Sequence, residues 1–251
     1  MKKNLLFLSV LSLIIFLVNG CWGDSPNVRK HHVFKSYITK YSNSKDVELD
    51  LSGRGNIVIL YKELSGSCDF KSKGADKARY DSLCKANNDL SYNKKRDYMA
   101  FPTWGVTSAM HITNIEVVSD KDFDATHPAG NSLKDIVRLV SNSPKKFIDS
   151  GYKETFDWDS YDIPESFKKE PAARIHSYDY RSTDRENYFP VDIKLSDFTA
   201  NDGRMLGNQH IFLGFLLFDV EPITNKEHTF TVTISLTDGR VFSKTITKTF
   251  E

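Results

Sequence analysis

Apolar and polar positions along the chain alternate mostly with a period of two, which predicts β-strands. Residues 47–51 alternate between apolar and acidic side chains, as expected for a strand with one buried face. A denser apolar run at 57–61 follows a polar, glycine-containing break, so the two segments together predict a hairpin. The apolar run at 211–218 predicts a buried strand, because it is too short for a helix that crosses a bilayer.

The clearest strand signal lies near the C-terminus, where two β-branched runs flank an Asp-Gly pair at 238–239. This pattern is typical of a tight hairpin. A two-residue loop would pair Leu236 with Val241, whereas a three-residue loop with a bulge at Gly239 would pair Leu236 with Phe242. We favour the three-residue loop because it gathers the apolar side chains on one face. These side chains belong to Val232, Leu236, Phe242 and Ile246.

Helical patterns are few. Residues 131–140 carry apolar side chains at the spacing i, i+3, i+4, i+7, which predicts a short helix. Ser132 with Asp135 resembles a capping box at its start. Residues 62–97 are rich in Lys, Asp, Ser and Asn, with weak helical character at 74–90. We interpret this stretch as a surface insertion and a candidate contact region.

Many short strands, a terminal hairpin and few helices predict a mainly-β fold. We expect an antiparallel β-sandwich with an immunoglobulin-like arrangement and one or two short helices. The length of 251 residues is compatible with one large domain. We therefore predict a single β-rich domain over residues 33–251, interrupted by the insertion at 62–97.

The N-terminal segment predicts export. Lys2 and Lys3 precede an apolar run at 5–18, which has the length of a signal-peptide core and is too short to span a bilayer. The run ends at Val-Asn-Gly-Cys, residues 18–21, which resembles the bacterial lipoprotein box. Cleavage after residue 20 and lipidation of Cys21 are therefore expected. Ordinary secretion and a retained membrane anchor are the alternatives.

Residues 22–32 are polar and lack periodicity, so we interpret residues 21–32 as the lipidated cysteine and a tether. Stable anchoring of a protein by lipid requires more than one acyl chain, and bacterial lipoprotein cysteines resemble that case. We therefore expect the protein to contact the membrane through its anchor. The expected location is the cell envelope, with the outer membrane as the favoured site.

The cysteine count agrees with lipidation. The chain has three cysteines, so modification of Cys21 leaves Cys68 and Cys84 as a pair. An exported protein can hold a disulfide, and we predict one between these two residues that staples the insertion. Two unpaired thiols are the alternative. No closely spaced Cys or His pair suggests a structural metal.

Charge and motifs exclude several functions. The formal net charge is +1, and removal of residues 1–20 takes away two lysines and no acids, which leaves 32 basic and 33 acidic residues. This near-neutral balance excludes the electrostatic footprint of a nucleic-acid-binding protein, so no nucleic acid partner is expected. The chain contains no recognisable catalytic motif, and we predict that it is not an enzyme.

Two acidic segments are candidate sites. Asp120, Asp122 and Asp124 have the alternate spacing of the first half of a calcium loop, and carboxylates in a turn can converge on one ion. However, Ala125 and Asn131 stand where such a loop has Gly and Glu. Calcium is therefore the candidate cofactor of this segment, and the alternative is a solvated connection between two elements.

The second segment mixes acids with aromatic rings, as sugar-binding sites do. It comprises Asp157, Trp158, Asp159 and Tyr161. Rings stack on sugar faces and acids accept hydrogen bonds from hydroxyl groups. A glycan hydrolase that uses the acids at 157–162 would need two carboxylates on opposite sides of one glycosidic bond. A surface loop with Trp158 turned inward is the alternative.

The lipoprotein box, the segment at 112–140 and the β-rich C-terminus resemble a group of Bacteroidota cell-envelope lipoproteins of unknown function. The resemblance implies an envelope location and supplies no activity. The sequence therefore predicts a lipid-anchored envelope protein with a non-catalytic binding or structural role. The expected partner is a glycan or another envelope protein.

Overall fold

The structure is a computed structural model that describes residues 31–53, 55–97, 106–158, 160, 185–207 and 212–251. The chain divides into two compact units. The smaller unit comprises residues 1–32 and 95–100, and the larger comprises 33–94 and 101–251. The predicted signal peptide, Cys21 and most of the tether lie outside the described residues.

Of the described residues, 45% lie in strands and 11% in helices, which confirms a mainly-β fold. The helical segments are α2 (Gly74–Ala86), α3 (Lys145–Asp149) and the 3-10 turn η1 (Arg185–Asn187). The strands are β1 (His31–Phe34), β2 (Lys40–Leu51), β3 (Ile57–Asp69), β4 (Lys94–Asp97), β5 (Val106–Ser108), β6 (Ile112–Ser119), β7 (Val137–Ser143), β8 (Phe189–Lys194), β9 (Phe212–Phe218), β10 (Glu227–Leu236) and β11 (Val241–Thr249). No helix in the described part of the chain is long and apolar enough to cross a membrane.

The predicted hairpin at 47–61 forms strands β2 and β3 of a six-stranded sheet with the order β5-β2-β3-β9-β7-β8. Leu49 pairs with Ile59, and the amide of Ser52 donates to the carbonyl of Asn56 to close the turn. The strands are 12 and 13 residues long, so they continue well past the apolar run that predicted them. Strand β5 adds to β2 in parallel, and the other pairs in this sheet are antiparallel.

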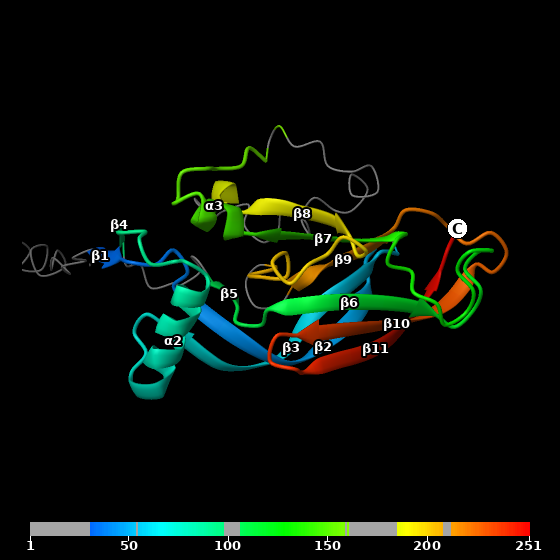
Figure 1. Cartoon of the computed structure of the whole chain (residues 1–251), viewed down its shortest axis with the longest axis horizontal. Helices are drawn as coiled ribbons and strands as arrows, with labels where there is room; N and C mark the ends of the chain where they lie inside the picture. The colour runs from blue at the N-terminus through cyan, green and yellow to red at the C-terminus, as the bar shows by residue number, and fades with distance from the viewer. Residues whose placement is uncertain (1–30, 54, 98–105, 159, 161–184, 208–211) are drawn as a thin grey trace, which may run out of the picture. The chain divides into compact units, whose positions relative to one another are not determined.

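The second sheet of the larger unit has the order β11-β10-β6, and Figure 1 shows its three strands side by side. The C-terminal hairpin has a three-residue loop, since the amide of Leu236 donates to the carbonyl of Arg240. The predicted partners are shifted: Phe242 pairs with Ile234 rather than with Leu236. The face is as predicted, because a shift of two residues returns the same side chains to the core. Val232, Leu236 and Phe242 are buried there.

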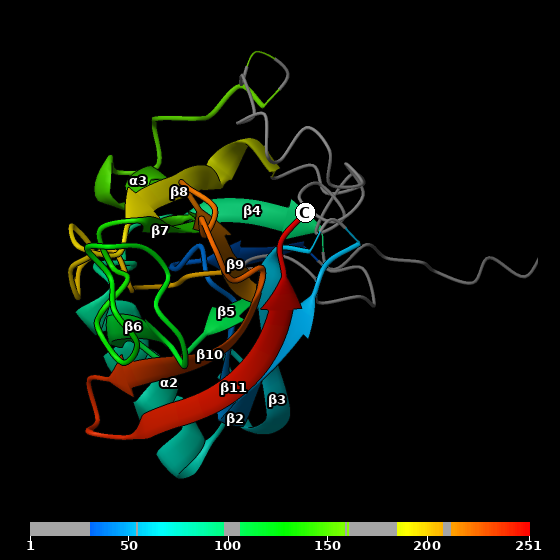
Figure 2. The ribbon, with the colours of Figure 1, turned by 90° about the vertical axis from the view of Figure 1, so that its right-hand side faces the viewer.

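The two sheets pack through one hydrophobic cluster. Val117 and Val232 of the three-stranded sheet share it with Ile57, Ile59 and Leu216 of the six-stranded sheet. Figure 2 shows the curved β10–β11 hairpin passing in front of β2 and β3. An immunoglobulin-like topology is not confirmed, and β1 with β4 forms a further two-stranded sheet.

The predicted insertion at 62–97 contains regular structure: the end of β3, helix α2 and β4. Tyr80 and Cys84 lie one helical turn apart on the buried face of α2 and join a second, aromatic-rich cluster. Asp89 is fully buried beside this cluster. Its carboxylate accepts hydrogen bonds from the amides of Tyr37 and Ile38, at 2.6 and 2.8 Å.

The predicted helix at 131–140 is wrong, since Val137 begins strand β7. This strand is an interior strand of its sheet, with β9 on one side and β8 on the other. Leu139 and Val140 are therefore buried on opposite faces, and the strand lacks the alternation that identifies a half-exposed strand. Its apolar positions coincide by chance with a helical spacing.

Candidate functional site

A dense set of polar contacts lies on residues 120–136, which we call the crossing loop. It carries the chain from β6 in one sheet to β7 in the other. The amide of Asp120 donates to the carbonyl of Thr229, and the amide of Thr229 donates back to the Asp120 carboxylate at 2.8 Å. Phe123 is fully buried and stacks on Phe218. The loop is therefore fixed at its start by β10 and by the main core.

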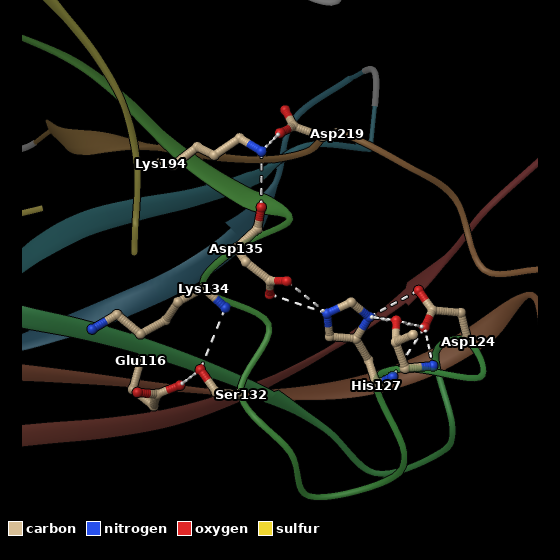
Figure 3. Close-up of polar contacts among 9 residues, drawn as sticks. Glu116, Asp124, His127, Ser132, Lys134, Asp135, Lys194 and Asp219 are labelled. Carbon is tan, nitrogen blue, oxygen red and sulfur yellow. Dashed lines mark hydrogen bonds and ion pairs between the residues drawn. The ribbon is translucent and has the colours of Figure 1, made fainter. Parts of the chain in front are cut away.

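His127 lies between two carboxylates of the same loop (Figure 3). Its Nδ1 is 2.9 Å from Asp124, and its Nε2 is 3.0 Å from Asp135. The imidazole ring is buried, whereas the Asp135 side chain is 64% exposed. We call this arrangement the Asp–His–Asp clasp.

Asp124 is positioned by the backbone of its own turn. The amides of Thr126 and His127 donate to Asp124 Oδ1 at 2.7 and 2.9 Å, and the Thr126 hydroxyl donates to the same oxygen. These hydrogen bonds hold the pKa of the Asp124 carboxyl well below its usual range. Asp124 is therefore ionised whenever His127 titrates.

The protonation state of His127 follows from its two partners. Burial lowers the pKa of an imidazole, but hydrogen bonds to Asp124 and Asp135 outweigh this effect and raise the pKa of His127 above its ordinary value. A ring that donates from both nitrogens is the imidazolium form. Because both nitrogens are then occupied, His127 is not available as a general base in this geometry.

The site extends into the six-stranded sheet through backbone and ion-pair contacts. Lys194 of β8 donates from Nζ to the carbonyl of Asp135 at 3.0 Å and pairs with Asp219, which follows β9, at 3.2 Å. Arg138 of β7 pairs with Asp192 of β8 at 2.7 Å. The end of the crossing loop is thus bound to β8 through Lys194, and the ion pairs link β8 to β7 and to the end of β9.

The loop is also held to β6, the strand from which it leaves. Ser132 donates to Glu116, and Lys134 donates from Nζ to Asn114 at 2.7 Å. Ser132 does not cap a helix, which is the role that the sequence pattern predicted for it. It forms an isolated bridge with Val118 instead.

The three acids proposed for calcium are not brought together. Asp120 binds the amide of Thr229, Asp122 accepts from the amide of Ala129 at 2.8 Å, and Asp124 belongs to the clasp. Within the described ranges no three Cys, His, Asp or Glu side chains form a group that could hold a metal ion. The alternate spacing places these acids in one loop, with each bound to a different donor.

The aromatic candidate site is described only in part, since Asp159 and Tyr161 lie outside the described residues. Asp157 is exposed, and Trp158 is half-buried. The Trp158 indole N–H donates to the carbonyl of Tyr188 at 2.9 Å, and its ring packs edge-on against Phe156. Trp158 is therefore turned toward the domain, as in the alternative interpretation of this segment.

The disulfide predicted between Cys68 and Cys84 is not seen; both are free, buried thiols. They belong to the same aromatic-rich cluster, where a free cysteine packs as a small apolar group. Burial raises the pKa of both thiols. The ionised, reactive form is therefore disfavoured at each position.

Sequence reasoning missed the clasp. The spacing of Asp124 and His127 places them in one turn, which is a local signal that was available. Asp135 lies eight residues beyond His127 and was interpreted as part of a helix cap. The hydrogen bond between Asp135 and His127 depends on the conformation of the whole loop.

Comparison with known proteins identified no homologue. No protein-family model matches the chain, and no similar curated protein or solved structure was found.

Proposed function

We propose that the chain is a lipid-anchored protein of the bacterial cell envelope with a non-catalytic binding or structural role. The observation that carries this proposal is the N-terminal pattern: a basic start, an apolar run of signal-peptide length and a lipoprotein box that ends on Cys21. The polar tether and the β-rich unit that follow are consistent with a folded domain displayed beside a membrane.

The non-catalytic part of the proposal is supported by the chemistry of the clasp. Both nitrogens of His127 are directed at carboxylates, so the ring does not activate a neighbouring nucleophile in this geometry. The glycan-hydrolase alternative has less support, because the indole of Trp158 points to a backbone carbonyl of its own domain. A sugar-stacking role would need an open ring face.

The binding role is supported by the architecture. Two packed sheets leave connecting loops at their ends, where binding residues concentrate when a rigid scaffold positions them. The immunoglobulin-like sandwich belongs to this proposal as the scaffold. The expected partner is a glycan or an envelope protein, contacted through loops such as the crossing loop.

Mass spectrometry of the mature N-terminus tests the anchor. We expect the wild-type chain to begin at an acylated Cys21 and to partition into the detergent phase. Cys21→Ser should abolish acylation and release the protein from membranes, and Ser25→Ala in the tether is the matched control that should behave as wild type. An unmodified N-terminus elsewhere than Cys21 would refute the proposal.

Binding is tested separately with the soluble Cys21→Ser protein on arrays of envelope glycans and envelope proteins. A saturable signal with one class is expected. If the array gives no signal, the binding role is refuted and the structural role is retained.

A further inference from the structure

The crossing loop joins the two sheets, and the His127 imidazole determines how firmly the loop is held. Between Asp124 and Asp135 the chain makes an excursion of ten residues, and His127 connects its two ends. The His127 ring is buried, and Figure 3 shows it between the side chains of Asp124 and Asp135. Any change in the hydrogen bonds of the His127 ring therefore affects all ten residues between Asp124 and Asp135.

The two hydrogen bonds to the ring depend on two protons. A neutral imidazole has one N–H donor and one nitrogen lone pair, so it can donate to only one of the two carboxylates. The second carboxylate would then face a lone pair, which is repulsive. Loss of one proton from His127 must therefore break one side of the clasp.

Geometry indicates which side opens. Asp124 is held by the backbone of its own turn in addition to the ring. The Asp135 carboxylate is mostly exposed, and among the described residues its side-chain hydrogen bonds are those to His127. Asp135 can turn into solvent at little cost, so the bond to Nε2 is the weaker one.

We propose that the crossing loop is a proton-operated clasp, closed when His127 carries a proton on both ring nitrogens and loosened when one proton leaves. The charged groups that act on the ring are Asp124 and Asp135, both from the loop. Lys194 of β8 acts on the same turn through the Asp135 carbonyl, and Asp219 pairs with Lys194.

Opening the clasp has a defined structural consequence. The amide of Phe123 donates to the carbonyl of His127 at 2.9 Å, so the turn that carries the imidazole also holds the loop over Phe123. The Phe123 ring packs against Phe218, Phe230 and Phe250 in the main core. A loosened clasp therefore uncovers one end of the core without disturbing the sheets.

Hydrogen exchange of the full mature chain in detergent tests the clasp at pH 6 and pH 9, after correction for the intrinsic pH dependence of exchange. We expect amides of residues 123–133 to lose at least about tenfold in protection at the higher pH, a free-energy change of roughly 1.4 kcal/mol. Amides of the β10–β11 hairpin should keep their protection. Equal protection of the loop at both pH values would overturn the proposal.

Two variants sharpen the test. Asp135→Asn replaces an exposed side chain and should give low protection of the loop at both pH values. Asp197→Asn changes an exposed acid in the turn after β8 and should keep the wild-type pH dependence. If Asp135→Asn also keeps it, the clasp is not the cause.

A spectroscopic readout needs no variant. The ¹⁵N shifts of the His127 ring should report an imidazolium at pH 6 and a titration midpoint above the ordinary value for histidine. A neutral ring at pH 6 would contradict the proposal even if the loop exchanges as expected.

Discussion

Gly203 packs directly against the backbone carbonyl of Ile112, so that a Cβ atom at position 203 would lie 1.8 Å from the carbonyl oxygen. The amide of Ile112 also donates to the Gly203 carbonyl at 3.0 Å. The segment before β9 and the start of β6 are therefore in direct backbone contact at Gly203. No side chain can be accommodated between them.

Gly203→Ala should destabilise the domain by about 1–3 kcal/mol or more, because the backbone must shift to relieve the overlap. Gly53→Ala is the matched control, since nothing lies within 4 Å of a Cβ at that position. It should change stability by less than about 1 kcal/mol. Urea denaturation measures both, and equal midpoints for the two variants would contradict the contact.

Asp89→Ala should cost at least about 1–3 kcal/mol of unfolding free energy, because it leaves donors without the carboxylate that accepts their hydrogen bonds. The donors that lose it are the amides of Tyr37 and Ile38 and the Tyr152 hydroxyl. Asp81→Ala removes an exposed acid that pairs with Lys77 and should cost less than about 1 kcal/mol. Thermal or urea unfolding compares the two variants, and similar losses would show that Asp89 is not a structural acceptor.

The clasp predicts the sign of a pH dependence. Because the pKa of His127 is raised in the folded state, its stabilising contribution is fully present below the ordinary histidine pKa and is lost as the pH rises through the folded pKa. Asp124 has a lowered pKa, so its contribution is present above the ordinary value of 3.8 and is lost as the pH falls through the folded pKa.

The difference in unfolding free energy between wild type and Asp135→Asn should therefore be larger at pH 6 than at pH 9. Denaturant titrations at the two pH values measure it. A difference that grows with pH would have the wrong sign for the clasp.

Cys68 and Cys84 should resist a polar alkylating reagent at neutral pH in the folded Cys21→Ser protein. Both thiols are buried, and their raised pKa values reduce the thiolate fraction that reacts. Both should react after unfolding in denaturant, so that mass spectrometry finds two adducts. A denatured, non-reduced chain without adducts would reveal the disulfide instead.

Calcium should not stabilise the domain, because each acid of the candidate loop is bound to a different donor. A ligand that binds the folded state at a hundred times its Kd would add about 2.7 kcal/mol and raise the Tm clearly. We expect no rise at millimolar calcium. A rise that Asp122→Asn abolishes would restore the calcium site.

The sequence predicts a strand well where only one face of the strand is buried, because apolar and polar residues then alternate. Strand β10 alternates strictly, so the buried face of the C-terminal hairpin follows from its residues even though the register is shifted. Strand β7 is buried on both faces and was mistaken for a helix. The spacing of Asp124 and His127 indicates one half of the clasp. The contact between Asp135 and His127 cannot be predicted from spacing, because it depends on how the crossing loop folds back toward β7.

The β2–β3 hairpin contributes to both the main core and the aromatic-rich cluster. Near one end of the pair, Tyr41 and Cys68 contribute to the aromatic-rich cluster, and near the other end Val47 and Ile59 contribute to the main core. A hairpin shared in this way couples the unfolding of the two clusters, because loss of packing in one removes contacts from strands that also support the other. The larger unit should therefore unfold in one cooperative transition. A destabilising substitution in α2 should lower the free energy of unfolding of the whole unit, including the far end of the sheets.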